Sequence, residues 1–173
     1  MYPKEYVDYL VHFHGDRDYF ECHEILEEYW KKTDPGNKDS IWVGLILLAV
    51  SAYHHRRKNF HGARKTLEKA IPIFKSHSNS IFQLGINEEK FTELLRNRLQ
   101  LINKNQAYES FALPIDDLDL QQLCIDTCKE YGYIWGDESN MENKELVHRH
   151  MLRDRTSVIE ERYQAQLAKR GGE

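Results

Sequence analysis

The chain has 173 residues, of which 40% are hydrophobic and 12% aromatic, and its formal net charge is −4. This composition excludes an intrinsically disordered chain, because it carries enough apolar surface to form a core. The longest apolar run, Ile41–Val50, is about half as long as a membrane span, and the charged N-terminus lacks a signal-peptide pattern. Cys22, Cys124 and Cys128 form no CxxC pair, so we expect reduced thiols in a cytoplasmic protein.

Hydrophobic periodicity predicts helices wherever it is clear and indicates no strand, so the predicted fold class is all-α. The first expected helix covers about residues 3–14, with a proline at its first position, and Gly15 ends it. Asp16 or Asp18 caps a second helix, which runs to about residue 32. That helix is amphipathic, so one of its sides should face the core.

The third expected helix begins after a cap at Asp39 or Ser40 and is apolar on almost every side through residues 41–50. We therefore place it at the centre of the fold. A fourth helix covers about residues 60–75, and Pro72 should bend or end it.

Two more helices follow over about residues 88–104 and 116–131, with an extended segment between them at residues 111–115. Residues 132–140 form a loop. The last helical pattern, about residues 141–170, carries a thin apolar stripe among charges and either extends into solvent or packs on a partner.

These elements predict a compact bundle of antiparallel helix pairs over residues 1–104. A helical segment over residues 105–140 should pack on this bundle. Residues 141–173 should form a long charged C-terminal helix with a frayed end.

The charge is distributed in blocks of opposite sign: residues 1–55 carry a net −5, residues 56–75 a net +6 and residues 109–138 a net −7. Such blocks favour packing between segments of one chain, or between copies of the chain.

An internal similarity appears when the chain is shifted by 41 residues, since an aromatic, small and leucine pattern of the second helix recurs in the fourth. The aligned pairs are His14 with His55, Tyr19 with Phe60, Cys22 with Ala63, Leu26 with Leu67, and Glu27 with Glu68. Two amphipathic helices can share this pattern by chance, and either origin implies antiparallel helix pairs with short connections.

The most distinctive string is residues 19–30, in which His23 and Glu27 are four residues apart and Glu24 points about 100° away, toward solvent. A zinc-protease helix needs a second histidine where Glu27 stands. The pair is therefore either an ion pair that fixes packing, or two metal ligands, or a general base with its orienting carboxylate. The candidates for a third metal ligand are His14, Asp18, His54 and His55.

Counting 1.5 Å per residue along two antiparallel helices places His54 near the level of Asp18 and Tyr19, above His23. This disfavours a metal site of His23, Glu27 and His54. It favours a partner for His23 on the first or fourth helix.

A basic segment follows the third helix, and its candidate patch is Arg56, Arg57, Lys58, Arg64, Lys65 and Lys69. Cations at a helix C-terminus are favoured by the helix dipole, which explains part of the cluster structurally. The patch would also suit nucleic acid, although no aromatic or glycine-rich binding motif accompanies it.

Tyr19-Phe-Glu-x-His-Glu-x-Leu-Glu-x-x-Trp30, Gly44-Leu-Ile46, His54 and Asn59-x-x-Gly62-Ala63-x-x-x-Leu67 stand in this order in the chain. Over about residues 10–75 this pattern resembles the small helical bacterial family called domain of unknown function 309. The resemblance implies a compact helical bundle and no established activity. It implies a candidate binding site of His23, Glu24, Glu27, Trp30, His54 and Asn59. Leu47 stands where the family pattern often has glutamine, which implies a drier pocket here.

The function predicted from these features is that of a non-enzymatic helical scaffold or interaction protein, which self-associates or binds a protein partner. We expect no cofactor, no bound metal and no membrane partner. One alternative is a metal-dependent or acid–base hydrolase-like enzyme that uses His23 and Glu27. The other is a nucleic-acid-binding protein that uses the basic residues 56–75.

Overall fold

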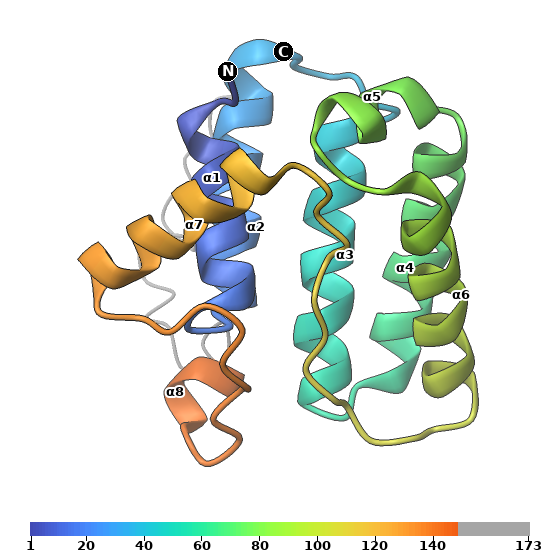
Figure 1. Cartoon of the computed structure of the whole chain (residues 1–173). Helices are drawn as coiled ribbons and strands as arrows, with labels where there is room; N and C mark the ends of the chain where they lie inside the picture. The colour runs from blue at the N-terminus through green and yellow to red at the C-terminus, as the bar shows by residue number, and fades with distance from the viewer. Residues whose placement is uncertain (149–173) are drawn as a thin grey trace, which may run out of the picture.

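The computed structural model describes residues 1–148, and this part of the chain is all-helical (Figure 1). The helices are α1 (Lys4–His14), α2 (Tyr19–Thr33), α3 (Ile41–Arg56), α4 (Phe60–Lys75), α5 (Ser78–Gln83), α6 (Glu88–Asn103), α7 (Leu118–Tyr131) and α8 (Lys144–Val147). Among these residues the extended pairing is limited to one isolated bridge between Ile86 and Ile115. The structure therefore confirms the all-α fold class.

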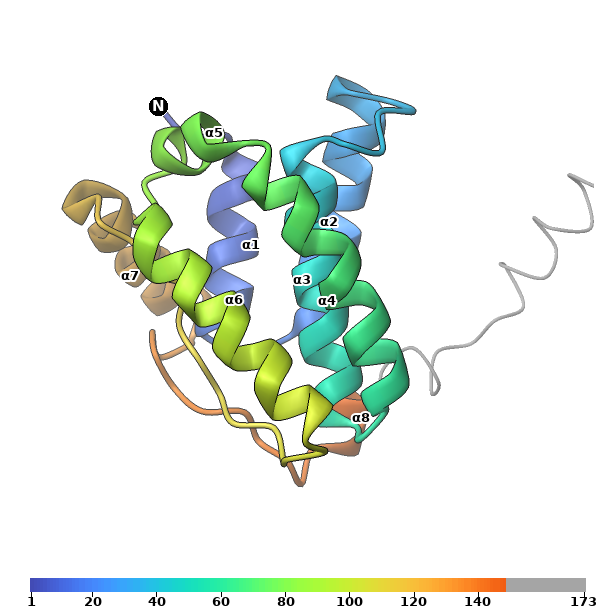
Figure 2. The same cartoon turned by 90° about the vertical axis from the view of Figure 1, so that its right-hand side faces the viewer.

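Helices α1 to α4 pack side by side in chain order, while α6 packs on α4 and α7 packs on α1 (Figures 1 and 2). The apolar helix α3 is central, as expected, with Leu45, Leu48 and Ala49 at most 1% exposed. Gly44 permits the close approach of α3 and α4, because a Cβ atom there would lie 2.9 Å from the Phe74 ring. No helix within residues 1–148 is long and apolar enough to cross a membrane.

For both α2 and α3, the structure shows which of the two expected residues caps the helix. Asp18 begins α2 by accepting the Glu21 N–H at 3.1 Å, and Ser40 begins α3 by accepting the Trp42 N–H at 3.2 Å. Pro3 stands one position before the first helical residue of α1. Each cap satisfies a backbone N–H that the helix itself leaves unpaired.

Helix α4 continues through Pro72 to Lys75, which confirms its predicted range, and of the two effects expected of this proline the ending of the helix does not occur. A proline removes one hydrogen bond to the residue four positions earlier, here Glu68. Both residues are exposed, so water can satisfy the unpaired carbonyl group. The short helix α5 was not predicted, because six residues give too little periodicity to recognise.

The similarity at a shift of 41 residues corresponds to two equivalent turns. Arg17 and Lys58 both adopt left-handed backbone conformations, with φ of 58° and 67°. The next residues, Asp18 and Asn59, both cap the following helix through a side-chain oxygen. The turn from α1 to α2 therefore repeats in the turn from α3 to α4.

Residues 104–117, which we call the strap, run between α6 and α7 across the front of α3 in Figure 1. Two buried histidines hold the strap. His14 Nε2 accepts the Leu113 N–H at 3.0 Å, and the His55 Nε2 atom lies 2.8 Å from the Gln106 carbonyl oxygen. These histidines are equivalent in the repeat, so the duplicated turns fasten the same extended segment at two points.

The predicted C-terminal helix over residues 141–173 lies mostly outside the described residues. Within the described part, only α8 (Lys144–Val147) is helical in this stretch. The Leu146 carbonyl oxygen accepts a hydrogen bond from Arg56, which attaches this region to the end of α3.

Candidate functional site

A pocket of about 240 Å³ lies between α2 and α3, and we call it the histidine pocket. Its lining residues are Tyr19, Phe20, His23, Val50, Tyr53 and His54. The structure thus brings two of the predicted site residues, His23 and His54, to one cavity. The walls around the two imidazole rings are mainly aromatic, since the Phe20 ring centre lies 5.8 Å from that of His23 and 6.2 Å from that of Tyr53.

His23 is held by a carboxylate of its own helix. Its Nε2 atom lies 2.7 Å from Glu27 Oε2, and the other oxygen of Glu27 lies 3.1 Å from Lys31 Nζ. This contact confirms the predicted pair of His23 and Glu27, four residues apart on one helix. Both members of the pair are about one-third exposed, so this is a half-buried contact that orients the imidazole at the pocket edge.

His54 is held from the turn that follows its helix. The Asn59 side-chain NH₂ group lies 3.3 Å from His54 Nδ1, while the Asn59 oxygen accepts the Gly62 N–H at 3.0 Å. A Cβ atom at Gly62 would lie 2.7 Å from this amide, so glycine is needed for the close approach. One asparagine therefore both begins α4 and orients a pocket histidine.

Replacing Asn59 with alanine is expected to lower the free energy of unfolding by about 1–2 kcal/mol, because α4 loses its cap. Asn59→Asp keeps an accepting oxygen and removes the NH₂ group that faces His54, so it should retain most of that stability. Urea denaturation of both variants measures the difference. An equal loss in the two variants would contradict the capping role.

Trp30 and Glu24 do not line the histidine pocket. Trp30 donates its ring N–H to the Asn37 carbonyl oxygen at 3.0 Å, which fastens the turn between α2 and α3. Glu24 is half-buried, although the helical wheel places it toward solvent. Trp30 therefore has a structural role at the far end of α2.

The described residues contain no group of three or more His, Cys, Asp or Glu side chains placed to hold a metal ion. The cysteine thiols stay protonated at neutral pH, since burial raises the pKa of Cys124 to about 12 and that of Cys128 to about 11. Burial raises the pKa of Cys22 as well. A thiolate nucleophile is therefore disfavoured at neutral pH.

The structure does not bring Arg56 to the surface with the rest of the basic patch, since this residue is only 1% exposed. Lys58, Lys65 and Lys69 are exposed, whereas Arg57 and Arg64 are half-buried. The surface patch is thus smaller than the sequence indicates.

A polar cluster that extends from Tyr19, a residue of the histidine pocket, was not predicted. The hydroxyl groups of Tyr19 and Tyr108 are hydrogen-bonded, and Tyr108 also contacts the Ser139 hydroxyl at 2.8 Å. Nearby, an Arg98 NH₂ group donates to His55 Nδ1 at 2.7 Å. The sequence pointed to this cluster only through the alignment of His14 with His55 at a shift of 41 residues. That alignment marks the two histidines as equivalent but does not predict which residues they contact.

Comparison with known proteins gives a relative and a family. The chain is 46% identical over 162 residues to the uncharacterized protein YpuF of Bacillus subtilis (strain 168), covering 94% of this chain and 93% of that protein. No solved structure matches the chain. The model of the family "Domain of unknown function (DUF309)" matches residues 6–66, which contain the histidine pocket and the cap of α4. The chain belongs to the DUF309 family.

Proposed function

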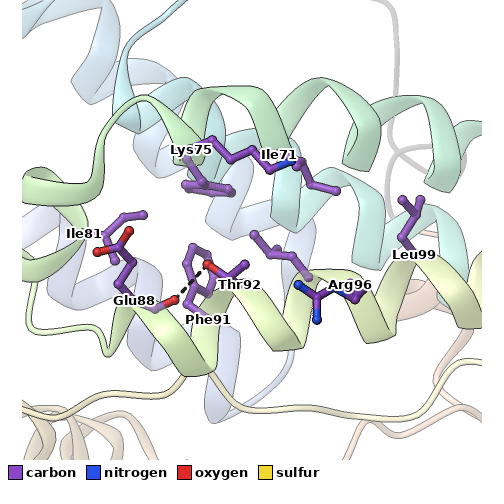
Figure 3. Close-up of a pocket in the computed structure, with 10 residues that line it drawn as sticks. Ile71, Lys75, Ile81, Glu88, Phe91, Thr92, Arg96 and Leu99 are labelled. Carbon is purple, nitrogen blue, oxygen red and sulfur yellow. Dashed lines mark hydrogen bonds between the residues drawn. The ribbon is translucent and has the colours of Figure 1, made fainter.

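We propose that the protein is a non-enzymatic helical scaffold that self-associates. The observation that carries this proposal is a pocket of about 300 Å³ between α4 and α6, which we call the α4–α6 groove (Figure 3). Its lining residues are Ile71, Phe74, Lys75, Ile81, Glu88, Phe91, Thr92, Leu95, Arg96 and Leu99. An apolar floor with charged side chains at its edge is typical of a protein-binding surface.

The proposal includes the predicted organisation of the chain. It comprises antiparallel helix pairs over residues 1–104, a segment over residues 105–140 that covers them, and a charged C-terminal helix over residues 141–173. The packing of α6 on α4 and of α7 on α1 supports the first two parts.

Three polar side chains within residues 30–59 support a role without chemistry, because their hydrogen bonds serve the fold. Asn59 caps α4, Trp30 fastens a turn and His55 holds the strap. Each of these hydrogen bonds holds a helix end, a turn or the strap in place.

Light scattering coupled to size-exclusion chromatography tests self-association over a wide range of protein concentration. The expected mass rises from the 20.6 kDa of one chain toward a multiple of it. A mass that stays at one chain at every concentration would overturn the proposal.

A second candidate function is acid–base chemistry at the histidine pocket. The 2.7 Å contact between His23 and Glu27 favours it, because a carboxylate on one ring nitrogen orients the imidazole toward the pocket as a general base requires. The two imidazole rings at one cavity add a further proton donor or acceptor.

Hydrolysis of a panel of chromogenic esters and phosphate esters tests this candidate. Activity that falls in both His23→Gln and Glu27→Gln, with the fold retained, would support it. Turnover that is absent, or equal in the two variants and the original protein, would remove it.

A further inference from the structure

The surface that α6 presents beside the α4–α6 groove has a regular pattern. Glu88, Thr92, Arg96 and Leu99 occupy positions i, i+4, i+8 and i+11, so they lie on one face of the helix. Figure 3 shows Glu88, Thr92 and Arg96 in a row along α6, beside the groove. The first three are exposed, and Leu99 is half-buried.

This pattern is self-complementary in charge. Thr92 is the midpoint, and an acidic and a basic residue stand four positions before and after it, which is about 6 Å along the axis in each direction. If two copies of α6 meet in opposite directions with their Thr92 residues adjacent, each Glu88 lies level with Arg96 of the partner subunit. The ion pair then forms twice, as an interface with two-fold symmetry requires.

Building on the proposed self-association, we propose that α6 pairs antiparallel with α6 of a second copy of this chain, about a two-fold axis near Thr92. The occupant of the α4–α6 groove is thus the matching edge of the second copy. In this arrangement the half-buried Ile71 and Leu99 become covered, and the buried Phe91 and Leu95 form the apolar floor of the groove beside the ion pairs.

The other charged residues of α6 lie at different distances from this face. Glu89 and Glu93 line a second hollow together with Glu88, Thr92 and Arg96, so they flank the proposed face. The exposed Lys90 lies about 160° around the helix from Thr92 and lines neither hollow. Lys75, on α4, lines the opposite wall of the groove and carries the charge opposite to that of Glu88. Within the row formed by Glu88, Thr92 and Arg96, the two copies of α6 therefore place no two like charges opposite each other.

Charge reversal tests both the face and the register. In Glu88→Arg, the new arginine lies level with Arg96 of the partner subunit, and in Arg96→Glu two acidic residues oppose each other. Each single variant is expected to weaken the homodimer by about 100-fold, because like charges replace both ion pairs. The double variant Glu88→Arg/Arg96→Glu should regain the original affinity.

Mixing the two single variants tests most directly whether residues 88 and 96 pair across the interface. One chain then carries two basic residues and the other two acidic residues, so the mixture should form a heterodimer although neither variant dimerises alone. Lys90→Glu is the matched control, since it reverses one exposed charge on the far side of the same helix and should leave the dimer unchanged. Circular dichroism verifies that each variant retains its helices.

The outcomes separate this inference from the proposed function. A protein that associates equally well with and without the two single substitutions keeps the proposed self-association but overturns the α6 pairing. Loss of association in the singles without recovery in the mixture or the double variant overturns the register at Thr92. A protein that is monomeric throughout overturns both proposals.

Discussion

Lowering the pH from about 7 to about 4.5 is expected to reduce the free energy of unfolding by about 2–3 kcal/mol through His14 alone. His14 is 1% exposed, and burial lowers its pKa to about 3. The nearby Arg17 cation lowers it further, whereas the hydrogen bond to the Leu10 carbonyl oxygen raises it. In the unfolded chain the same imidazole titrates near its ordinary pKa of 6.5.

The sign of the effect follows from which state binds the proton. Between about pH 6.5 and about pH 3 the unfolded chain is protonated at His14 while the folded chain is not, so protons favour unfolding. The stability that neutral His14 contributes is fully present above its ordinary pKa of 6.5, and it is lost as the pH falls toward its pKa of about 3 in the folded chain. His55 acts in the same direction, because burial and the neighbouring Arg98 lower its pKa as well.

The hydrogen bonds explain why both rings must be neutral. His14 Nδ1 lies 2.8 Å from the Leu10 carbonyl oxygen, so it carries the hydrogen, and Nε2 accepts the Leu113 N–H. A second proton on the ring would face that N–H group and break the attachment of the strap. Acid therefore acts on the strap first, before the contacts among α1 to α4.

Urea denaturation as a function of pH measures this effect, with His14→Gln as the comparison. The glutamine side chain offers one donor and one acceptor but does not titrate, so the stability of the variant should depend less on pH below about 6.5. Equal pH dependence in the two proteins would contradict the assignment to His14. Amide exchange at Leu113 reports separately on the strap.

The helices themselves could be predicted from the sequence, because their signals are local. The cap before the apolar run of α3 predicted where that helix begins, and the periodicity of α4 predicted a helix over about residues 60–75, as observed. For the cap of α3 the sequence left a choice between Asp39 and Ser40. The path of the preceding turn decides which of the two side chains reaches the helix. The strap bonds of His14 and His55 join residues that are 99 and 51 positions apart, which no local pattern can specify.

The candidate site shows the same division between local and distant signals. Counting heights along α2 and α3 placed His54 beside Tyr19, and both do line the histidine pocket. The count placed His23 too far away, because it located Cα atoms only. Side chains in a helix tilt toward its N-terminus, so the His23 ring extends toward Phe20, one turn earlier.

Replacing Arg56 with alanine is expected to lower the free energy of unfolding by about 3 kcal/mol or more, although the sequence places this residue in a surface patch. Its guanidinium donates to the Arg17 carbonyl oxygen at 2.6 Å and to the Leu146 carbonyl oxygen at 3.2 Å. It also lies 4.6 Å from the centre of the Tyr19 ring. Alanine would leave two carbonyl groups without their donor and open a cavity between α2, α3 and the region of α8.

The contribution of hydrogen bonding can be separated from that of packing. Arg56→Met retains most of the side-chain volume but no donor, so it should recover the part of the loss that comes from the cavity. Lys65→Ala is the matched control, since it removes a cation of the same predicted patch that is exposed on α4. That control should change stability by about 0.5 kcal/mol or less.

Thermal and urea denaturation of the three variants decide between a surface and an interior role for Arg56. If Arg56→Ala proves as mild as Lys65→Ala, the residue is not the interior link that its contacts describe. If Arg56→Met is as stable as the original protein, packing alone accounts for the effect and the two carbonyl groups find other donors. The expected order of stability, with Lys65→Ala highest, Arg56→Met next and Arg56→Ala lowest, would show that a cation in the basic segment connects three parts of the fold.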